Sequence, residues 1–212
     1  MSSESVAPRT VVAAVSLDAA SLVALLRASF FARQLGGELR VVHVLWEPAE
    51  PSAVRLRESA RIVLEWARGA GVDLPPECVV IRAGSPDVEL ARVASTASTG
   101  LLVLGGRADG DSGSPGHVAR FVARNATAPV VVTSPPAPSR RVVAASDLRD
   151  ERYPVLRAAA AFAVALGARA TAVHNVEAAA GESTASSERL LEGVARSACF
   201  DEALVTREPT AP

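Results

Sequence analysis

The residues with the clearest chemical potential are glycines that follow an apolar run near the middle of the chain. Leu101–Leu104 is continuously apolar, as in a strand buried on both faces, and Gly105 and Gly106 follow it directly. The segment 107–115 then leads to Gly116, where a helix is expected to open. Unpaired backbone N–H groups at a helix start, beside glycines that admit a ligand to the backbone, form an anion site. Most glycine-rich loops between a strand and a helix are ordinary turns, and on the local pattern a turn is favoured; phosphate binding is the alternative.

Two familiar phosphate-binding motifs do not fit this segment. The chain contains no lysine, so the loop lacks the Gly-Lys-Ser/Thr of a P-loop. It also lies after three other expected strands, whereas the Gly-x-Gly-x-x-Gly dinucleotide motif opens from a first strand.

The histidines are the other candidates for chemistry. His43 and His174 lie inside valine-rich strands, where a hydrogen-bonded core residue is expected. His117 lies at a helix start, where the helix dipole disfavours its protonation. It is either a neutral donor to a phosphate or a surface residue. No Ser–His–Asp set, carboxylate pair or metal cluster can be defended, so we predict no catalytic or metal residues and at most a weak ATPase.

Composition narrows the function classes. The chain has 212 residues, a net charge of -1 and only arginine as its basic residue, which gives no reason to expect nucleic acid or an anionic membrane as partner. Cys78 and Cys199 show no metal or disulfide spacing, as in a reducing compartment. No signal peptide and no membrane-spanning run is visible. A cytoplasmic location is expected.

The elements that must position the glycine segment alternate between strand and helix. Pro129 ends the helix after Gly116, and Asp18 is placed to cap the first helix. Within the helix at 87–97, Val88 and Leu90 are expected to face the core. Alternation of this kind predicts an α/β fold with a parallel five-stranded sheet and helices on both faces. The expected strands are 10–15, 39–45, 78–81, 101–104 and 130–132, and the expected helices are 19–35, 53–70, 87–97 and one from about 116.

After a proline-rich segment, 133–139, the chain begins again. Residues 9–45 and 140–176 align without a gap at an offset of 131, so that Val42-His43 matches Val173-His174. A looser match continues through a helix at 187–198 and a strand at 203–206, without a counterpart of residues 86–133. The sequence thus predicts a complete domain at 1–136 and a partial second copy at 137–212.

The repeated unit resembles the universal stress protein domain. The resemblance rests on the first strand, the Val-His-Val at 42–44, the Gly-Ser-Pro at 84–86 and the block 101–132. In that family a strand ends in Gly-x-x-Gly, about nine residues follow, and then come Gly-Ser/Thr-Val, a helix and a Pro-Val-Val-Val strand. The resemblance covers nearly the whole chain, as a tandem type with a truncated second domain.

The family implies a sheet in the order 3-2-1-4-5 with the ligand at its switch point. It implies ATP or AMP as the ligand, with Mg²⁺ accompanying ATP, in a protein that acts as a sensor or switch. Val44 would meet adenine and Ser16 would face the ribose. Gly105, Gly116, His117 and Val118 would cradle the phosphates, and Leu104 and Arg107 complete the expected nucleotide-binding set.

The chain departs from the family pattern at several positions. Ser16 replaces the acid that ends the first strand, although Asp18 follows two residues later, and Ala108 replaces the second glycine. His117 replaces the Ser/Thr, and the intervening loop carries Asp109 and Asp111, which oppose a triphosphate unless a divalent ion bridges them. The second copy keeps an acid, Asp147, but lacks the phosphate loop.

The truncation predicts an exposed sheet edge at 142–145, which invites pairing. We expect this edge to be covered either by packing on the first domain or by another chain, and a homodimer is expected. The alternative to a nucleotide-binding switch is a stress-response scaffold that binds no nucleotide and acts through dimerisation.

Overall fold

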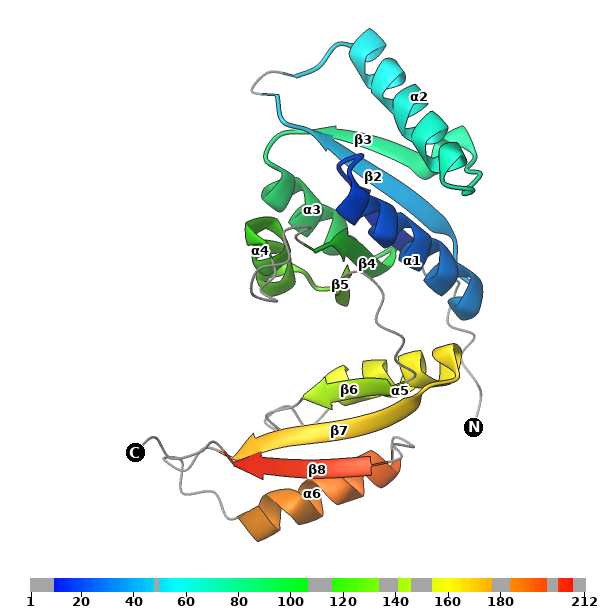
Figure 1. Cartoon of the computed structure of the whole chain (residues 1–212). Helices are drawn as coiled ribbons and strands as arrows, with labels where there is room; N and C mark the ends of the chain where they lie inside the picture. Colours follow the sequence, from blue (N-terminus) through cyan, green and yellow to red (C-terminus); the bar gives the residue numbers. More distant parts are fainter. Residues whose placement is uncertain are drawn as a thin grey trace. The chain divides into compact units, whose positions relative to one another are not determined.

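The computed structural model describes residues 10–47, 50–106, 116–133, 141–145, 154–176, 184–197 and 202–207. The chain divides into two compact units, Met1–Pro136 and Ala137–Pro212, which are described separately below (Figure 1). Over the described residues, no helix is both long and apolar enough to cross a membrane.

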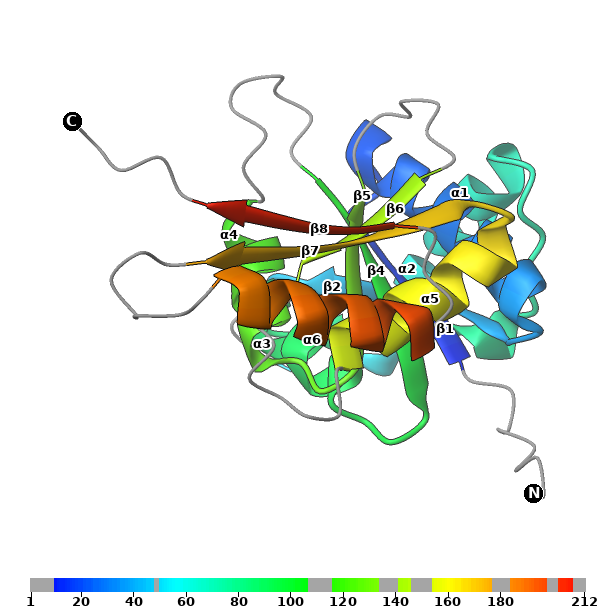
Figure 2. The same cartoon turned by 90° about the horizontal axis from the view of Figure 1, so that it is seen from below.

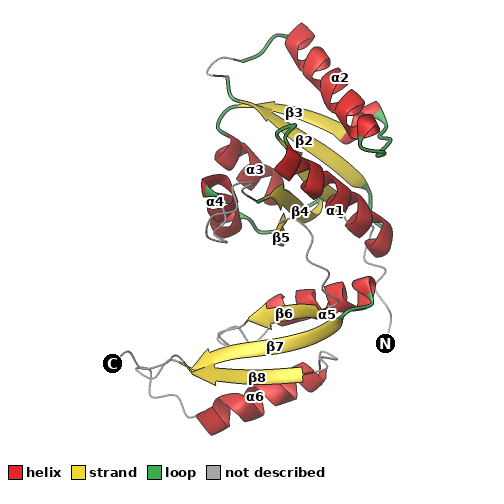
Figure 3. Ribbon diagram, in the orientation of Figure 1, coloured by secondary structure: helices red, strands yellow, loops and turns green. Residues whose placement is uncertain are grey.

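The first unit is an α/β domain with a five-stranded parallel sheet in the order β3-β2-β1-β4-β5. This order confirms the expected fold class, and Figure 3 labels β3, β2, β4 and β5 of the sheet. A short 3₁₀ turn at Pro76–Cys78 precedes β3. The elements are β1 (Thr10–Val15), α1 (Ala19–Leu35), β2 (Leu39–Leu45), α2 (Ala53–Gly69), β3 (Val79–Ala83), α3 (Pro86–Ala94), β4 (Thr99–Gly105), α4 (His117–Asn125) and β5 (Val130–Thr133).

Local sequence signals set the limits of α1 as expected. Asp18 caps the helix, with the Ser21 side chain completing a reciprocal capping box. Gly36 ends it in the left-handed conformation, with φ of 62°, which glycine adopts without steric cost.

Helix α3 is shorter than the expected 87–97. It ends at Ala94 because the hydroxyls of Ser95 and Thr96 donate to the carbonyls of Ala91 and Val93, at 2.9 and 2.8 Å, and turn the chain toward β4. Within the helix Leu90 is buried as expected, whereas Val88 is 37% exposed.

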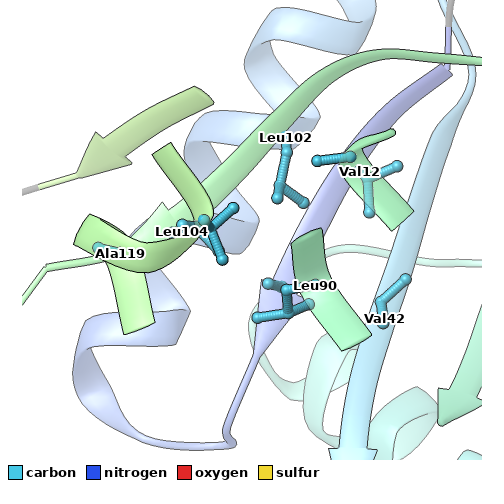
Figure 4. Packing of buried hydrophobic residues seen from close by; sticks show 9 residues of the cluster. Val12, Val42, Leu90, Leu102, Leu104 and Ala119 are labelled. Atoms are coloured by element: carbon cyan, nitrogen blue, oxygen red, sulfur yellow. The ribbon is translucent and has the colours of Figure 1, made fainter. Parts of the chain in front are cut away.

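Right-handed crossovers place α1 and α2 on one face of the sheet and α3 and α4 on the other. On the second face Leu90 of α3 and Ala119 of α4 pack over Val42, Leu102 and Leu104 (Figure 4). Burial of each leucine contributes about 1.5–3 kcal/mol, so this layer fixes α3 and α4 on the sheet.

The second unit is a three-stranded parallel sheet in the order β6-β7-β8. Figure 2 shows α5 and α6 along one side of it. Its register pairs Val142 with Ala170 and Ala145 with Val173, and each number is 131 above the β1–β2 pairs Val11–Leu39 and Ala14–Val42. The elements are β6 (Arg141–Ala145), α5 (Pro154–Leu166), β7 (Arg169–Val176), α6 (Thr184–Ser197) and β8 (Glu202–Arg207).

Candidate functional site

A cavity of about 270 Å³ opens at the carboxyl ends of β1 and β4. The chain leaves β1 toward β2 and leaves β4 toward β5, so the two connections diverge and leave a crevice at the switch point of the sheet. The lining residues are Ala14, Val15, Ser16, Asp18, Ala20, Ser21, Val42, Val44, Pro86, Leu90, Leu104, Gly105, Gly106, Val118 and Ala119.

The structure brings together much of the set that the sequence predicted. Ser16, Val44, Leu104, Gly105 and Val118 all line the cavity. Gly116 and His117 do not line it but begin α4 immediately before Val118. Arg107 lies outside the described residues, as do Ala108, Asp109 and Asp111.

The inner walls of the cavity are apolar. Val42 and Val44 come from β2, Leu104 from β4, Leu90 from α3 and Val118 from α4. The sheet and the helices on one of its faces therefore both supply hydrocarbon surface to one small space. Such walls favour the flat, weakly polar face of a ring system over a strongly hydrated group.

The polar side of the cavity is the turn from β1 into α1. The Ser21 backbone N–H donates to Asp18 Oδ1 at 2.7 Å, and the Ser16 hydroxyl donates to Asp18 Oδ2 at 2.8 Å. Desolvation raises the pKa of the Asp18 carboxyl, but the hydrogen bonds from Ser21 and Ser16 together outweigh it and hold that pKa below its ordinary value. Asp18 is therefore ionised at neutral pH.

The same turn contains a strained residue. Leu17, between Ser16 and Asp18, has φ of 65°, in the left-handed region that a branched side chain rarely adopts. Strain of this kind costs about 1–3 kcal/mol and is typical of functional sites, where surrounding contacts impose it. Here the strained residue stands between Ser16 and Asp18, both of which line the cavity.

The start of α4 differs from the start of α1. Gly116 is its N-cap, and no side chain in the described part of the chain caps the helix. The first amide with a helical acceptor is that of Arg120, which donates to the Gly116 carbonyl at 3.0 Å. The amides of His117, Val118 and Ala119 precede it and have no intrahelical acceptor. This helix start is suited to an anion.

His117 is held by the neighbouring helix. Its Nε2 lies 3.4 Å from Asp87 Oδ2, an ion pair whenever the imidazole is protonated. The Ser85 hydroxyl donates a hydrogen bond to the Asp87 carboxylate and lowers its pKa. Desolvation raises this pKa, but the Val88 N–H and His117 also lower it, so that the pKa of Asp87 lies below its ordinary value. This cluster links the starts of α3 and α4.

Gly105 and Gly106 are required by packing of the chain on itself. A Cβ at Gly105 would lie 2.9 Å from the backbone of Ala20, and one at Gly106 would lie 2.5 Å from the Thr133 carbonyl oxygen. The Gly106 N–H donates to that same oxygen at 2.7 Å, so it is already paired. The sequence indicated glycines at an anion site, and the structure gives them a second role in joining β4 to α1 and β5.

His43 makes the kind of core contact expected from its sequence. Its Nδ1 lies 2.8 Å from the Val15 carbonyl oxygen, the last acceptor of β1. A carbonyl cannot donate, so Nδ1 carries the proton in this contact. His43 therefore fixes the end of β1 next to Ser16.

Two features of the site were not predicted from the sequence. Ser21 lines the cavity, and the signal was its position three residues after Asp18, which is the capping-box spacing. Pro86 also lines it, because the β3–α3 turn opens at the same edge of the sheet as the β1–α1 turn. Among the described residues, no group of three or more His, Cys, Asp or Glu side chains is arranged to hold a metal ion.

Comparison with known proteins identifies the family and the fold. The model of the universal stress protein family matches residues 8–134, more than half of the chain. No curated protein matches the sequence significantly.

Several solved structures share the architecture. A universal stress protein from Archaeoglobus fulgidus DSM 4304 aligns over 94% of this chain and 79% of its own, with 17% identity and a TM-score of 0.66. A protein from Pseudomonas aeruginosa UCBPP-PA14 described as a putative universal stress protein aligns over 96% and 75%, with 15% identity and a TM-score of 0.60. A universal stress protein in complex with cAMP aligns over 59% of this chain and 97% of its own, with 21% identity and a TM-score of 0.46.

The five-stranded parallel sheet in the order 3-2-1-4-5, with helices around it, is the fold of these proteins. With the family model covering β1 to β5, the chain belongs to the universal stress protein family.

Proposed function

We propose that the first unit binds an adenine nucleotide in the cavity between β1 and β4 and acts as a ligand-dependent sensor or switch. The observation that carries this proposal is one cavity with apolar walls that reaches the uncapped N-terminus of a helix. A nucleotide needs both features, since its base is apolar on its faces and its phosphate is an anion.

The apolar part of the cavity is suited to the base. Val44 and Leu104 would contact the purine ring, and the backbone of Val44 would hydrogen-bond to the edge of that ring. Ser16 and Asp18 stand on the polar side, where a hydroxyl and a carboxylate can pair with the ribose hydroxyl groups.

The start of α4 is suited to the phosphate. The amides of His117, Val118 and Ala119 have no intrahelical acceptor, and the helix dipole adds favourable charge there. Gly116 puts no side chain in the way. Gly105 shapes the adjoining strand end, and we include Arg107 because it follows that strand directly in the sequence.

Mg²⁺ would enter this site with ATP rather than occupy a site of its own, because no metal-ligand group is found among the described residues. No step of chemistry is proposed.

A calorimetric titration of the full chain with AMP tests the proposal. Saturable binding near one site per chain is expected, and the variant Val118→Trp, which fills the cavity from α4, abolishes it. Val54→Trp is the matched control, because Val54 is 71% exposed on α2 and adds the same ring away from the cavity. Equal AMP binding by both variants contradicts the assignment of the cavity, and the absence of heat with the unmodified chain contradicts nucleotide binding.

We further propose that residues 1–136 form the complete domain and that 137–212 form a partial second copy, which supplies a second function in dimerisation. The equal registers at an offset of 131 support the duplication. In the first unit Val12 of β1 is 3% exposed, whereas its counterpart Val143 of β6 is 61% exposed.

The position of β6 at the end of its sheet favours the second function. Among the described residues β6 pairs with β7, and no described strand lies along its other edge, which can therefore accept a strand from a second copy. Light scattering on the eluting full chain is expected to give a dimer, and Val143→Lys a monomer that keeps its helical signal. A monomeric unmodified chain, or a dimer unaffected by Val143→Lys, contradicts this function.

A further inference from the structure

We infer that the cavity selects a nucleoside or nucleoside monophosphate over the corresponding di- and triphosphates, a specificity that rests on the proposed nucleotide binding. The inference comes from how the chain's own carboxylates occupy the helix starts around the cavity.

Three helices begin at the cavity: Ala20 and Ser21 of α1, Pro86 of α3, and Val118 and Ala119 of α4 line it. Each helix start is a place where a phosphate finds unpaired amides and a favourable dipole. The number of phosphates that the cavity accepts therefore depends on how many of these starts are free.

Two of them are not free. At α1 the Asp18 carboxylate already accepts from the Ser21 N–H at 2.7 Å. At α3 the first residue is Pro86, which has no N–H, and the Asp87 carboxylate accepts from the Val88 N–H at 2.8 Å. A ligand phosphate at either start would have to displace a carboxylate or lie beside one.

Among the described helix starts at the cavity, the start of α4 is left for the ligand, and the neighbouring strand end adds little. The Gly106 N–H is paired with the Thr133 carbonyl oxygen at 2.7 Å. The amides at the start of α4 suffice for one phosphate group. The cavity volume of about 270 Å³ is also just below the range of about 300–1,000 Å³ that is common for ligand sites.

Charge acts in the same direction. Asp18 is the charged side chain among the described residues that line the cavity, and no described arginine lines it. Asp87 pairs with His117, so the imidazole is not fully available to a second phosphate. Among the described lining residues, each added phosphate therefore adds negative charge near the Asp18 carboxylate without a matching cation.

The test is calorimetry of the full chain with adenosine, AMP, ADP and ATP, with EDTA present to remove divalent ions. AMP is expected to bind about tenfold or more tightly than ATP, with ADP between them, and tenfold corresponds to about 1.4 kcal/mol. Mg²⁺ is expected to reduce the difference between the AMP and ATP affinities, because it neutralises charge on the outer phosphates.

The variant that tests the cause is Asp18→Asn with Asp87→Asn, in which each side chain keeps an acceptor oxygen while its charge is removed; at Asp18, the N-cap of α1, asparagine caps a helix about as well as aspartate. This double variant is expected to bring the ATP affinity to within about threefold of the AMP affinity. The remaining difference in binding free energy is then about 0.65 kcal/mol. Asp73→Asn, which removes one charge from a carboxylate that does not line this cavity, is expected to leave the ratio unchanged.

The outcomes separate the two proposals. ATP binding as tight as AMP in EDTA, or a ratio that the double variant does not change, overturns the selectivity while leaving nucleotide binding in place. No binding of any of the four compounds overturns the proposed function itself.

Discussion

The contact between Gly105 and α1 gives a prediction whose size follows from the structure. In Gly105→Ala the new Cβ would lie 2.9 Å from both the carbonyl carbon and oxygen of Ala20 and 3.1 Å from Ser21 N. These are backbone atoms of the first turn of α1, which the Asp18 capping box fixes, so the added atom has no flexible neighbour to displace. Overpacking of this kind costs about 1–3 kcal/mol. For a unit of this size the melting temperature falls roughly 4 °C per kcal/mol, which predicts a loss of roughly 4–12 °C.

Tryptophan fluorescence follows the melting of this unit selectively, since both tryptophans, Trp46 and Trp66, belong to it. Gly69→Ala is the matched control: it lies at the end of α2 with nothing within 4 Å of its added Cβ. This control should keep or slightly raise the melting temperature. At about 4 °C per kcal/mol, the predicted loss is well above 1 °C. If the melting temperature of Gly105→Ala lies within about 1 °C of that of the control, β4 does not approach α1 as closely as described.

Three further predictions concern α4, α1 and β5. Gly116→Asp supplies a carboxylate to the free amides of α4, so AMP binding should weaken at least tenfold, or by about 1.4 kcal/mol, while adenosine binding persists in calorimetry. Gly116→Ala serves as its control and should bind both compounds, and equal AMP affinity of the two variants would exclude a phosphate at α4. Asp18→Ala should cost about 0.5–2 kcal/mol in urea unfolding at pH 7. Because the pKa of Asp18 is lowered in the folded state, its stabilising effect is complete above the ordinary value of 3.8 and is lost as pH falls through the folded value. The difference from the unmodified chain should therefore shrink below pH 3.8, and a difference independent of pH would contradict it. Thr133→Val removes the buried hydroxyl that donates to the Leu104 carbonyl at 3.0 Å, so urea unfolding should show a loss of about 1–3 kcal/mol; an unchanged midpoint would contradict the role of that bond.

The sequence predicted the sheet because its strands are short apolar runs with clear breaks. Asp18 and Gly36 gave the limits of α1 through local capping chemistry that acts within a few residues. The end of α3 was placed too late, because hydroxyl bonds from Ser95 and Thr96 compete with the helix in a way that apolar spacing does not reveal.

The candidate site could be predicted in outline and not in its details. Parallel strands bring their carboxyl ends to one edge, so Ser16, Val44 and Leu104 follow from the strand order once it is known. The pairing of Asp87 with His117 joins residues thirty positions apart, and it depends on the packing of α3 against α4. The close backbone contacts at Gly105 and Gly106 likewise depend on tertiary packing, so the local sequence pattern does not reveal them.

The measurement that tests the central claim most directly is an NMR titration of the ¹⁵N-labelled full chain with AMP. The account predicts saturable shifts confined to the cavity, at the amides of Val44, Gly105 and Val118 and at the start of α4, while the second unit stays unchanged. Shifts that avoid these amides, or no shifts at millimolar AMP, would show that this cavity is not a nucleotide site.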